Sequence, residues 1–491
     1  MSQALPPLLE DALRRTARRY RAPALPATLQ DARAAGAATA LAVAIEHART
    51  ALARGEAPED AVQTLFLDAL ADLIGEAMRP LKTHGDDIAE SGGDPAFQAM
   101  VLRHRSAVVR EYASLSAHAE RDRRAVRAAV NALAHPAKTQ RRSPGPAREA
   151  LLALHAAGEA GDWAHVSDVI APLRDLPEVR TEPLLLRGLE RLADDSAMKH
   201  LRRLDALSSD ALVARYRALW DRQGPVAGSE QAAASGAGAQ QRGDAVEALA
   251  TEALDALVSR MNAEGGSGVG TGHGDVGISA GVGISAGVGG TRYRVATSLR
   301  VPPSFPGDAQ RAKSEWDVAL LRRHGTAEPG DEDWDLCLLI EAKASPDAAT
   351  TDLPRLLRGL RLLAQADIGT TYGFASNDGD VRLRGASLST LPTEQGDLAR
   401  AVLYCCDGPE ERAPRLLNAA SRMQLLSAEA SLDVAMRLED GSPVTPSLLR
   451  PVWRLLLEAP AFTSVLHQYA TLRVVRELMV HPHDLLTAVT A

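Results

Sequence analysis

The sequence predicts a mostly helical α+β protein with one α/β segment near its centre. Its composition is 45% apolar but only 3% aromatic, and this balance favours helices over an all-β sandwich. Apolar residues recur at spacings of three and four up to residue 222 and again after about residue 408, which is the period of helices. From Arg292 onward the period becomes that of strands, with short apolar or alternating runs separated by loops.

Length, charge and cysteine content narrow the class of protein. With 491 residues, the chain is long enough for roughly two to four domains. The net charge of −8 gives no global basic signature, so any nucleic-acid-binding surface must be local. Three cysteines, two of them adjacent, form neither a disulfide framework nor a CxxC metal-binding pair, which fits a reducing cytoplasm. The sequence starts without a signal-peptide pattern, and no apolar run reaches the roughly 20 residues that span a bilayer. We therefore expect a cytoplasmic protein without a membrane partner.

Proline- and glycine-rich breaks divide the sequence into segments. In the second helical segment, "REALLALHAAGEAGDWAHVSDVIAPL" predicts a helix, a Gly-Asp turn and a returning helix. A later glycine-rich stretch has two copies of VGISAG, lacks GK[ST] and follows a helix, so it predicts a flexible loop and not a phosphate-binding loop. The helical segments are candidate surfaces for a protein partner or for a homo-oligomer. The predicted organisation is an N-terminal helical domain (1–135), a paired-helix domain (146–222), a flexible linker (223–243), a domain with the α/β segment (244–408) that includes the glycine-rich loop (265–290), and a C-terminal helical region (409–491).

The run "LCLLIEAK" ends an apolar strand with two opposite charges. Residues two apart share a face of a strand, so Glu341 and Lys343 point the same way, while Leu338, Ile340 and Ala342 occupy the other face. Cys337 and Leu339 continue the charged side as apolar residues. Both faces of this strand are therefore predicted to be buried, as in a central strand that carries two charges at its end.

The preceding strand candidate, "SEWDVALL", has a similar pattern. Glu315 and Asp317 share one of its faces. If the two strands are neighbours, three carboxylates and one ammonium gather in one place. Crowded carboxylates repel one another and lose hydration unless a cation compensates, and a hard divalent cation such as Mg²⁺ does so.

These residues resemble the PD-(D/E)xK, restriction-endonuclease-like nuclease superfamily, whose core order is helix, three strands, helix, strand (αβββαβ). Residues 244–376 show that order, with the fourth strand assigned to "GTTYGFAS" (369–376). The resemblance implies that Asp317 and Glu341 bind Mg²⁺ or Mn²⁺, and that Lys343 positions or activates the attacking water. It also implies that Glu315 is an additional acid. In the first helix, "GDAVEALA" places Glu247 as an acid near the metal, with Glu252 as the alternative in the same helix.

A basic stripe follows the charged strand. Arg355, Arg358 and Arg361 recur every third residue of a predicted helix. Such a row suits a nucleic-acid backbone, and it equally suits a solvated helix face.

Together these patterns predict a metal-dependent nuclease that hydrolyses phosphodiester bonds of DNA or RNA, in bacterial defence or DNA processing. Two alternatives stay open: a helical scaffold or interaction protein with a catalytically silent nuclease-like domain, and a secreted antibacterial nuclease effector.

Overall fold

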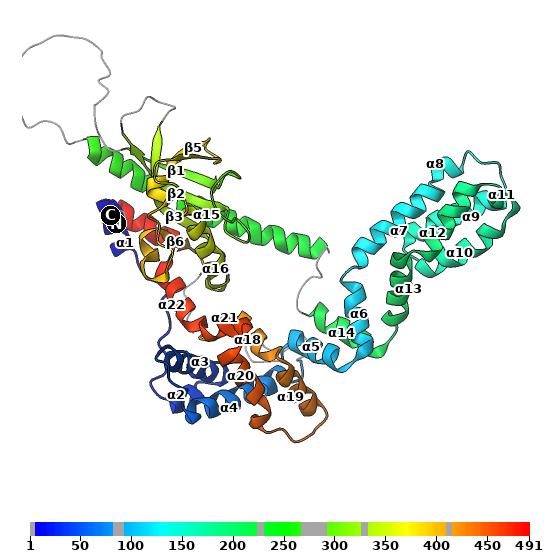
Figure 1. Ribbon diagram of the computed structural model, residues 1–491, viewed down its shortest axis with the longest axis horizontal. Coiled ribbons are helices and arrows are strands. Elements are labelled where there is room, and N and C mark those ends of the chain that lie inside the picture. The colour runs from blue at the N-terminus through cyan, green and yellow to red at the C-terminus, as the bar shows by residue number, and fades with distance from the viewer. Residues whose placement is uncertain (1–4, 82–92, 223–229, 267–291, 326–331, 409–414) are drawn as a thin grey trace, which may run out of the picture. The chain divides into compact units, whose positions relative to one another are not determined.

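The computed structural model describes residues 5–81, 93–222, 230–266, 292–325, 332–408 and 415–491 (Figure 1). Most of these residues are helical, and seven strands among them form one mixed sheet. By its internal contacts the chain divides into two compact units. We call them the sheet unit (Met1–Asp72, Ala227–Leu425 and Leu449–Ala491) and the helical unit (Leu73–Val226 and Leu426–Leu448).

The bounds of the elements are as follows. The strands are β1 (Tyr293–Arg300), β2 (Glu315–His324), β3 (Asp333–Ala342), β4 (Thr371–Phe374), β5 (Val381–Arg384), β6 (Val402–Cys405) and β7 (Met479–Val480). The helices that begin in the sheet unit are α1 (Pro7–Arg15), α2 (Leu29–Ala34), α3 (Ala37–Ala53), α4 (Asp60–Ala77), α15 (Glu230–Gly266), α16 (Pro346–Leu363), α17 (Gly385–Leu388), α18 (Ala419–Leu426), α20 (Arg450–Glu458), α21 (Thr463–Leu466), α22 (Gln468–Leu478) and α23 (Pro482–Thr490), with 3₁₀ turns η1 (Gln395–Arg400) and η3 (Pro460–Phe462). Those that begin in the helical unit are α5 (Pro95–Arg105), α6 (Ala107–Ser116), α7 (Ala119–Ala134), α8 (Pro136–Thr139), α9 (Pro146–Ala160), α10 (Trp163–Asp175), α11 (Pro177–Arg180), α12 (Pro183–Asp194), α13 (Ser196–Ser208), α14 (Ala211–Asp221) and α19 (Glu429–Glu439), with the 3₁₀ turn η2 (Pro446–Leu449).

The contact-defined units differ from the segments that the sequence suggests. Helix α15 begins at Glu230, inside the predicted linker 223–243, because its Ala- and Gln-rich start has high helix propensity. Residues 223–229 of that linker lie outside the described residues. So does the predicted glycine-rich loop 265–290, apart from its first two residues at the end of α15. The C-terminal region supplies α19 to the helical unit and α22 and α23 to the sheet unit.

The sheet is built around β3. Strands β1, β2 and β3 form an antiparallel meander. Along its other edge β3 pairs in parallel with β5 at its start and with β6 at its end. Strand β4 is antiparallel to β5, and β7 is parallel to β6. A single bridge between Arg300 and Ala375 brings the chain after β4 back to the free edge of β1.

The sequence predicts that residues 369–376 form the fourth strand of the αβββαβ order. This prediction is wrong, because the strand that lies beside the charged end of β3 is β6. Segment 369–376 does contain a strand, β4, but β4 pairs with β5. In β6 all four residues are buried. A short, fully buried parallel strand shows no alternation of polar and apolar residues, so its sequence does not reveal it.

Helices cover both faces of the sheet. On one face, Val318 and Leu338 share a buried cluster with Leu254 of α15. On the other face, Leu339 and Trp316 share a cluster with the leucines of α16. Those leucines, Leu353, Leu356, Leu357 and Leu360, recur at helical spacing and are all buried. Each such side chain contributes roughly 1.5–3 kcal/mol to folding.

A bulge in β3 changes which face one residue occupies. The pairing of β2 with β3 shifts register between Leu320 and Leu321, and Cys337 is the extra residue on β3. Cys337 therefore packs with the cluster on the α15 side, whereas Leu339 belongs to the opposite cluster. The prediction that Cys337 and Leu339 share a face is wrong, because a bulge breaks the two-residue period.

The helical unit contains the predicted paired helices. Helix α9 ends at Ala160, and Gly161 follows in the left-handed conformation (φ 73°) that glycine adopts most readily. Asp162 then caps α10, since its side chain accepts a hydrogen bond from the His165 amide at 2.9 Å. Leu154 of α9 and Ile170 of α10 share one buried cluster. The Gly-Asp turn thus reverses the chain so that two apolar faces meet.

Candidate active site

Asp317 and Glu341 lie beside each other at the ends of β2 and β3. The paired residues of these strands include Val318 with Ile340, and the same register places Asp317 opposite Glu341. The carboxylate Oδ2 of Asp317 accepts a hydrogen bond from the backbone amide of Ala342 at 2.8 Å. This bond ties the Asp317 side chain to the last residue of β3. The two acids that the sequence singles out are therefore brought together.

Glu341 is completely buried and contacts two lysines. Its Oε2 atom lies 3.1 Å from Nζ of Lys343 and 2.6 Å from Nζ of Lys313. Burial and the Asp317 carboxylate raise the pKa of Glu341 to about 7, although Lys313 and Lys343 act in the opposite direction. The other oxygen, Oε1, is buried and has no hydrogen-bond partner among the described residues. One oxygen of Glu341 is thus held by ammonium groups while the other is left unpaired.

Lys343 lies between the strand and the helix that follows. Its backbone amide donates to the Cys405 carbonyl of β6 at 2.8 Å, and two residues later Ser345 caps α16. Burial alone lowers the pKa of Lys343, but the nearby carboxylates Glu341, Asp352 and Asp317 outweigh it and raise the pKa. The side chain of Lys343 is 17% exposed. Its ammonium therefore stays charged close to the surface.

A short chain of polar contacts leads from Lys343 to α16. The Lys343 Nζ atom lies 3.4 Å from Oδ2 of Asp352, and the Tyr404 hydroxyl donates to that same oxygen at 3.4 Å. Oδ1 of Asp352 lies 4.0 Å from Nη1 of Arg355. Burial, followed by Asp352, raises the pKa of Tyr404, so the phenol stays protonated and remains a donor.

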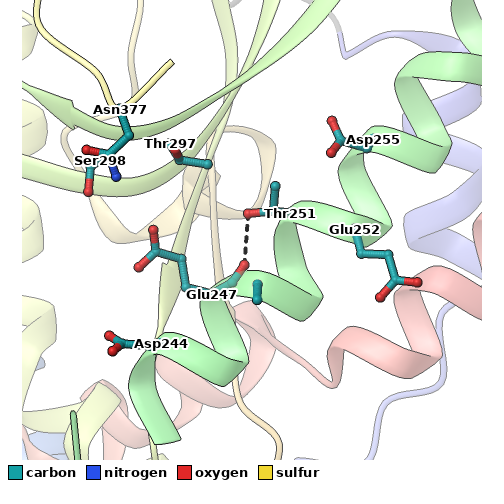
Figure 2. A pocket seen from close by; sticks show the side chains of 9 residues that line it. Asp244, Glu247, Thr251, Glu252, Asp255, Thr297, Ser298 and Asn377 are labelled. Carbon is teal, nitrogen blue, oxygen red and sulfur yellow. Dashed lines mark hydrogen bonds between the residues drawn. The ribbon is translucent and has the colours of Figure 1, made fainter. Parts of the chain in front are cut away.

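Glu247 faces this site from α15. Burial raises its pKa, and Asp317, Asp244 and Glu315 raise it further by repulsion. Figure 2 shows Glu247 pointing toward β1, on the side of Thr297 and Ser298, whereas Glu252 points away from them. Glu315 is half-exposed and lies 3.2 Å from Arg300 Nε. Glu247 is thus the helix acid close to Asp317, and Glu315 is partly neutralised by an arginine.

The acids of α15 line a pocket of about 680 Å³. Its wall includes Asp244, Glu247, Glu252 and Asp255 from α15, together with Thr297, Ser298 and Asn377 (Figure 2). This concentration of carboxylates makes the pocket strongly negative, which disfavours a phosphate and favours a cation.

Ser298 stands opposite Asp317 on the other neighbour of β2. The pairing of β1 with β2 includes Thr297 with Val318 and Leu299 with Trp316, and Ser298 is skipped between them. Its φ of 49° is in the left-handed region, which costs a residue with a Cβ atom about 1–2 kcal/mol. The chain is therefore strained at the point where β1 passes Asp317.

The three predicted nucleic-acid-binding arginines are exposed on α16. Arg355, Arg358 and Arg361 all face solvent. Arg358 Nε also donates to the carbonyl of Arg311 at 2.9 Å, which links the loop before β2 to the helix. The three arginines lie on the same helix as Asp352, which is the ion-pair partner of Lys343.

Two carboxylates of the site are available as ligands for a hard divalent cation. Within the described ranges, no group of three or more His, Cys, Asp or Glu side chains is arranged to hold a metal ion. Mg²⁺, however, is commonly held by one or two carboxylates with water and phosphate completing its ligands. Asp317 and the unpaired Oε1 of Glu341 supply two oxygen donors of that kind. The donor set therefore fits Mg²⁺ and does not form a closed cage.

Sequence reasoning missed several residues of this site. Lys313 lies in the loop before β2, where no period marks it as buried. Asp352 and Tyr404 join the site through the packing of α16 and β6, and Ser298 through a break in pairing. The one local signal is Asp352 itself, an acidic residue about two turns into the helix that follows the charged strand end, where it pairs with Lys343.

Comparison of the chain with protein-family models, with curated proteins and with solved structures gives no match. In the part of the chain that the structure describes, no helix combines the length and apolar character needed to cross a membrane. The fold and site together define an α+β unit in which two carboxylates and two lysines converge at the ends of adjacent antiparallel strands.

Proposed function

We propose that the protein is a phosphodiesterase of the nuclease class, with a restriction-endonuclease-like sheet unit that acts with Mg²⁺ or Mn²⁺. The observation that carries the proposal is the convergence of Asp317, Glu341 and Lys343 at one point. The order α15, β1, β2, β3, α16, β6 supports it, because it is the αβββαβ order of that superfamily with β4, β5, α17 and η1 inserted before the last strand.

Each residue has a distinct part in phosphodiester hydrolysis. Asp317 and Glu341 would hold the cation. A bound divalent cation supplies positive charge for the developing charge on phosphate and lowers the pKa of a coordinated water. Lys343 presents an ammonium beside the same point and donates to a phosphate oxygen or to the attacking water. Asp352 and Tyr404 keep Lys343 in place.

The charges around the site indicate the side from which nucleic acid approaches. The pocket along α15 is lined by carboxylates and repels a phosphate backbone. The exposed Arg355, Arg358 and Arg361 lie on the other side of the sheet, on α16. We therefore place the substrate backbone along α16, where these arginines attract phosphates without reading sequence.

Cleavage of defined substrates tests the proposal. Purified protein is incubated with plasmid DNA, single-stranded DNA and RNA, in Mg²⁺ or Mn²⁺ and in EDTA. We expect cleavage of at least one substrate that requires the cation and is abolished in Lys343→Ala. Glu264→Gln, a change at an exposed position near the end of α15 and outside the pocket, is the matched control and keeps activity. Full activity of Lys343→Ala, with folding verified by circular dichroism, would defeat the proposal.

One observation favours a second candidate, a scaffold with a catalytically silent nuclease-like unit. Lys313 and Lys343 already compensate Glu341 without any metal, so the site is stable as it stands. On this alternative the panel gives no cleavage with either cation, and the helical unit carries the function through a protein partner. A protein that cleaves in Mg²⁺ and not in EDTA excludes it.

A further inference from the structure

A second lysine, Lys313, is built into the site from outside the predicted motif. Its Nζ atom lies 2.6 Å from Glu341 Oε2, and only 5% of its side chain is exposed. The ammonium also lies 5.7 Å from the centre of the Trp316 ring, which stabilises its charge. Gly359 of α16 packs directly on this residue: an added Cβ there would lie 2.8 Å from Lys313 Cβ. Lys313 is thus enclosed by the strand, the helix and an aromatic ring.

The two lysines are not equivalent. Lys343 is shared between Glu341 and Asp352 and is partly exposed, so it is able to reach a substrate. Lys313 is buried and its ammonium contacts Glu341 and the Trp316 ring. Lys313 is therefore too enclosed to contact a substrate. Its position allows it to orient the carboxylate of Glu341.

Both ammonium groups bind the same oxygen of Glu341. Oε2 contacts Lys313 and Lys343, whereas Oε1 is buried and, within the part of the chain that the structure describes, has no hydrogen-bond partner. A buried carboxylate oxygen without a hydrogen-bond partner is energetically unfavourable in the cation-free protein. Such an oxygen is suited to a cation, and the Asp317 carboxylate lies close enough to Glu341 to raise its pKa.

We propose that Lys313 is a positioning residue: a built-in counter-ion that holds Oε2 of Glu341, leaves Oε1 as the oxygen for a divalent cation, and competes with that cation for the charge of Glu341. This inference rests on the proposed function, because it assigns the cation to the Asp317–Glu341 site. In the cation-free protein Lys313 compensates the buried charge of Glu341. When a cation binds, the positive charge of Lys313 weakens its binding, and the site therefore releases the cation more readily than a purely acidic site.

The test compares Lys313→Met, which keeps an apolar stem of similar length, with wild type and with Lys343→Met as the matched control. Thermal unfolding is measured in EDTA and in Mg²⁺, and Mn²⁺ affinity is measured by calorimetry. We expect Lys313→Met to unfold at a lower temperature than wild type in EDTA. Added Mg²⁺ should raise the unfolding temperature of Lys313→Met by more than it raises that of wild type. Because a nearby positive charge has been removed, Lys313→Met should also bind Mn²⁺ about tenfold or more tightly. Mg²⁺ should raise the unfolding temperature of Lys343→Met by less than that of Lys313→Met, since Lys343 is partly exposed.

A double variant separates charge compensation from packing. In a Glu341→Gln background there is no carboxylate charge to compensate, so we expect Lys313→Met to lower thermal stability only a little there. The double variant also keeps the test valid if Lys313→Met alone fails to fold. An equal loss of thermal stability in both backgrounds, or Mn²⁺ affinity that does not rise in Lys313→Met, overturns the inference. Neither readout needs nuclease activity. Tighter Mn²⁺ binding without cleavage by wild type therefore rejects the proposed function alone, and cleavage with unchanged Mn²⁺ affinity rejects the role of Lys313 alone.

Discussion

Replacement of Gly359 by alanine tests how α16 packs on the site. Gly359 is buried in the middle of α16, and an added Cβ would lie 2.8 Å from Lys313 Cβ, 3.0 Å from Lys313 O and 3.1 Å from Trp316 Cζ2. Two of these neighbours cannot turn aside, because one is backbone and the other belongs to a fully buried ring. The helix must therefore move away from Lys313.

The size of the effect follows from two opposing contributions. Alanine favours a helix interior over glycine by roughly 0.5–1 kcal/mol. Forcing an extra methyl group into a packed core costs about 1–3 kcal/mol. We therefore expect Gly359→Ala to lower the free energy of unfolding by about 0.5–2 kcal/mol. The matched control is Gly243 of α15, where an added Cβ meets no atom of the described residues within 4 Å, so Gly243→Ala should gain about 0.5–1 kcal/mol.

Scanning calorimetry of the two variants beside wild type measures both effects. We expect the two variants to change Tm in opposite directions, with the Tm of Gly359→Ala lower by roughly 1–6 °C and that of Gly243→Ala unchanged or higher. If Gly359→Ala melts at or above the wild-type temperature, α16 does not lie as close to Lys313 as described, and the enclosure of the site by this helix is refuted.

Three further predictions concern individual residues. Asp317→Asn keeps an acceptor for the Ala342 amide and should fold normally, whereas Asp317→Ala removes it and should lose about 1–3 kcal/mol in urea unfolding; equal stability of the two would contradict the hydrogen bond. Hydrogen bonds from Arg142 hold the pKa of Glu182 below its usual value, so their contribution is complete at pH 7 and is lost as the pH falls through the lowered pKa. Because both side chains are partly exposed, Glu182→Gln should cost at most about 1 kcal/mol at pH 7 and nothing near pH 2 in urea unfolding, and a loss that persists in acid would contradict this origin. Ser298→Gly relieves the left-handed φ of 49° and should leave thermal stability unchanged or raise it by up to about 1 kcal/mol, so a clear loss would show that the strain is absent.

The central pair of acids was accessible from sequence because it depends on one local rule. Side chains alternate along a strand, and two strands joined by a short connection pair as neighbours. Asp317 and Glu341 therefore needed only the correct register, which the apolar runs around them provide. Lys343 follows by the same two-residue period, and its ion pair with Glu341 explains the opposite charges at the end of the strand.

The rest of the site depends on distant parts of the chain. Lys313 is buried because Gly359 allows a helix to close over it, and no pattern in the sequence links those two residues. Tyr404 arrives on a four-residue strand that is buried on both faces and so lacks alternation. Cys337 changes face through a bulge, which shifts the period by one residue. Tertiary packing sets each of these positions, and local periodicity does not record it.

Initial rates of nucleic-acid cleavage across a Mg²⁺ titration, for wild type, Asp317→Asn and Glu264→Gln, test most directly whether Asp317 holds the cation. We expect wild type and Glu264→Gln, an exposed position outside the pocket, to share one Mg²⁺-dependent rate curve. Asp317→Asn, although folded, should fall by at least about a hundredfold, because it removes a carboxylate from the cation. A wild-type rate in Asp317→Asn, or cleavage that persists in EDTA, would contradict the account.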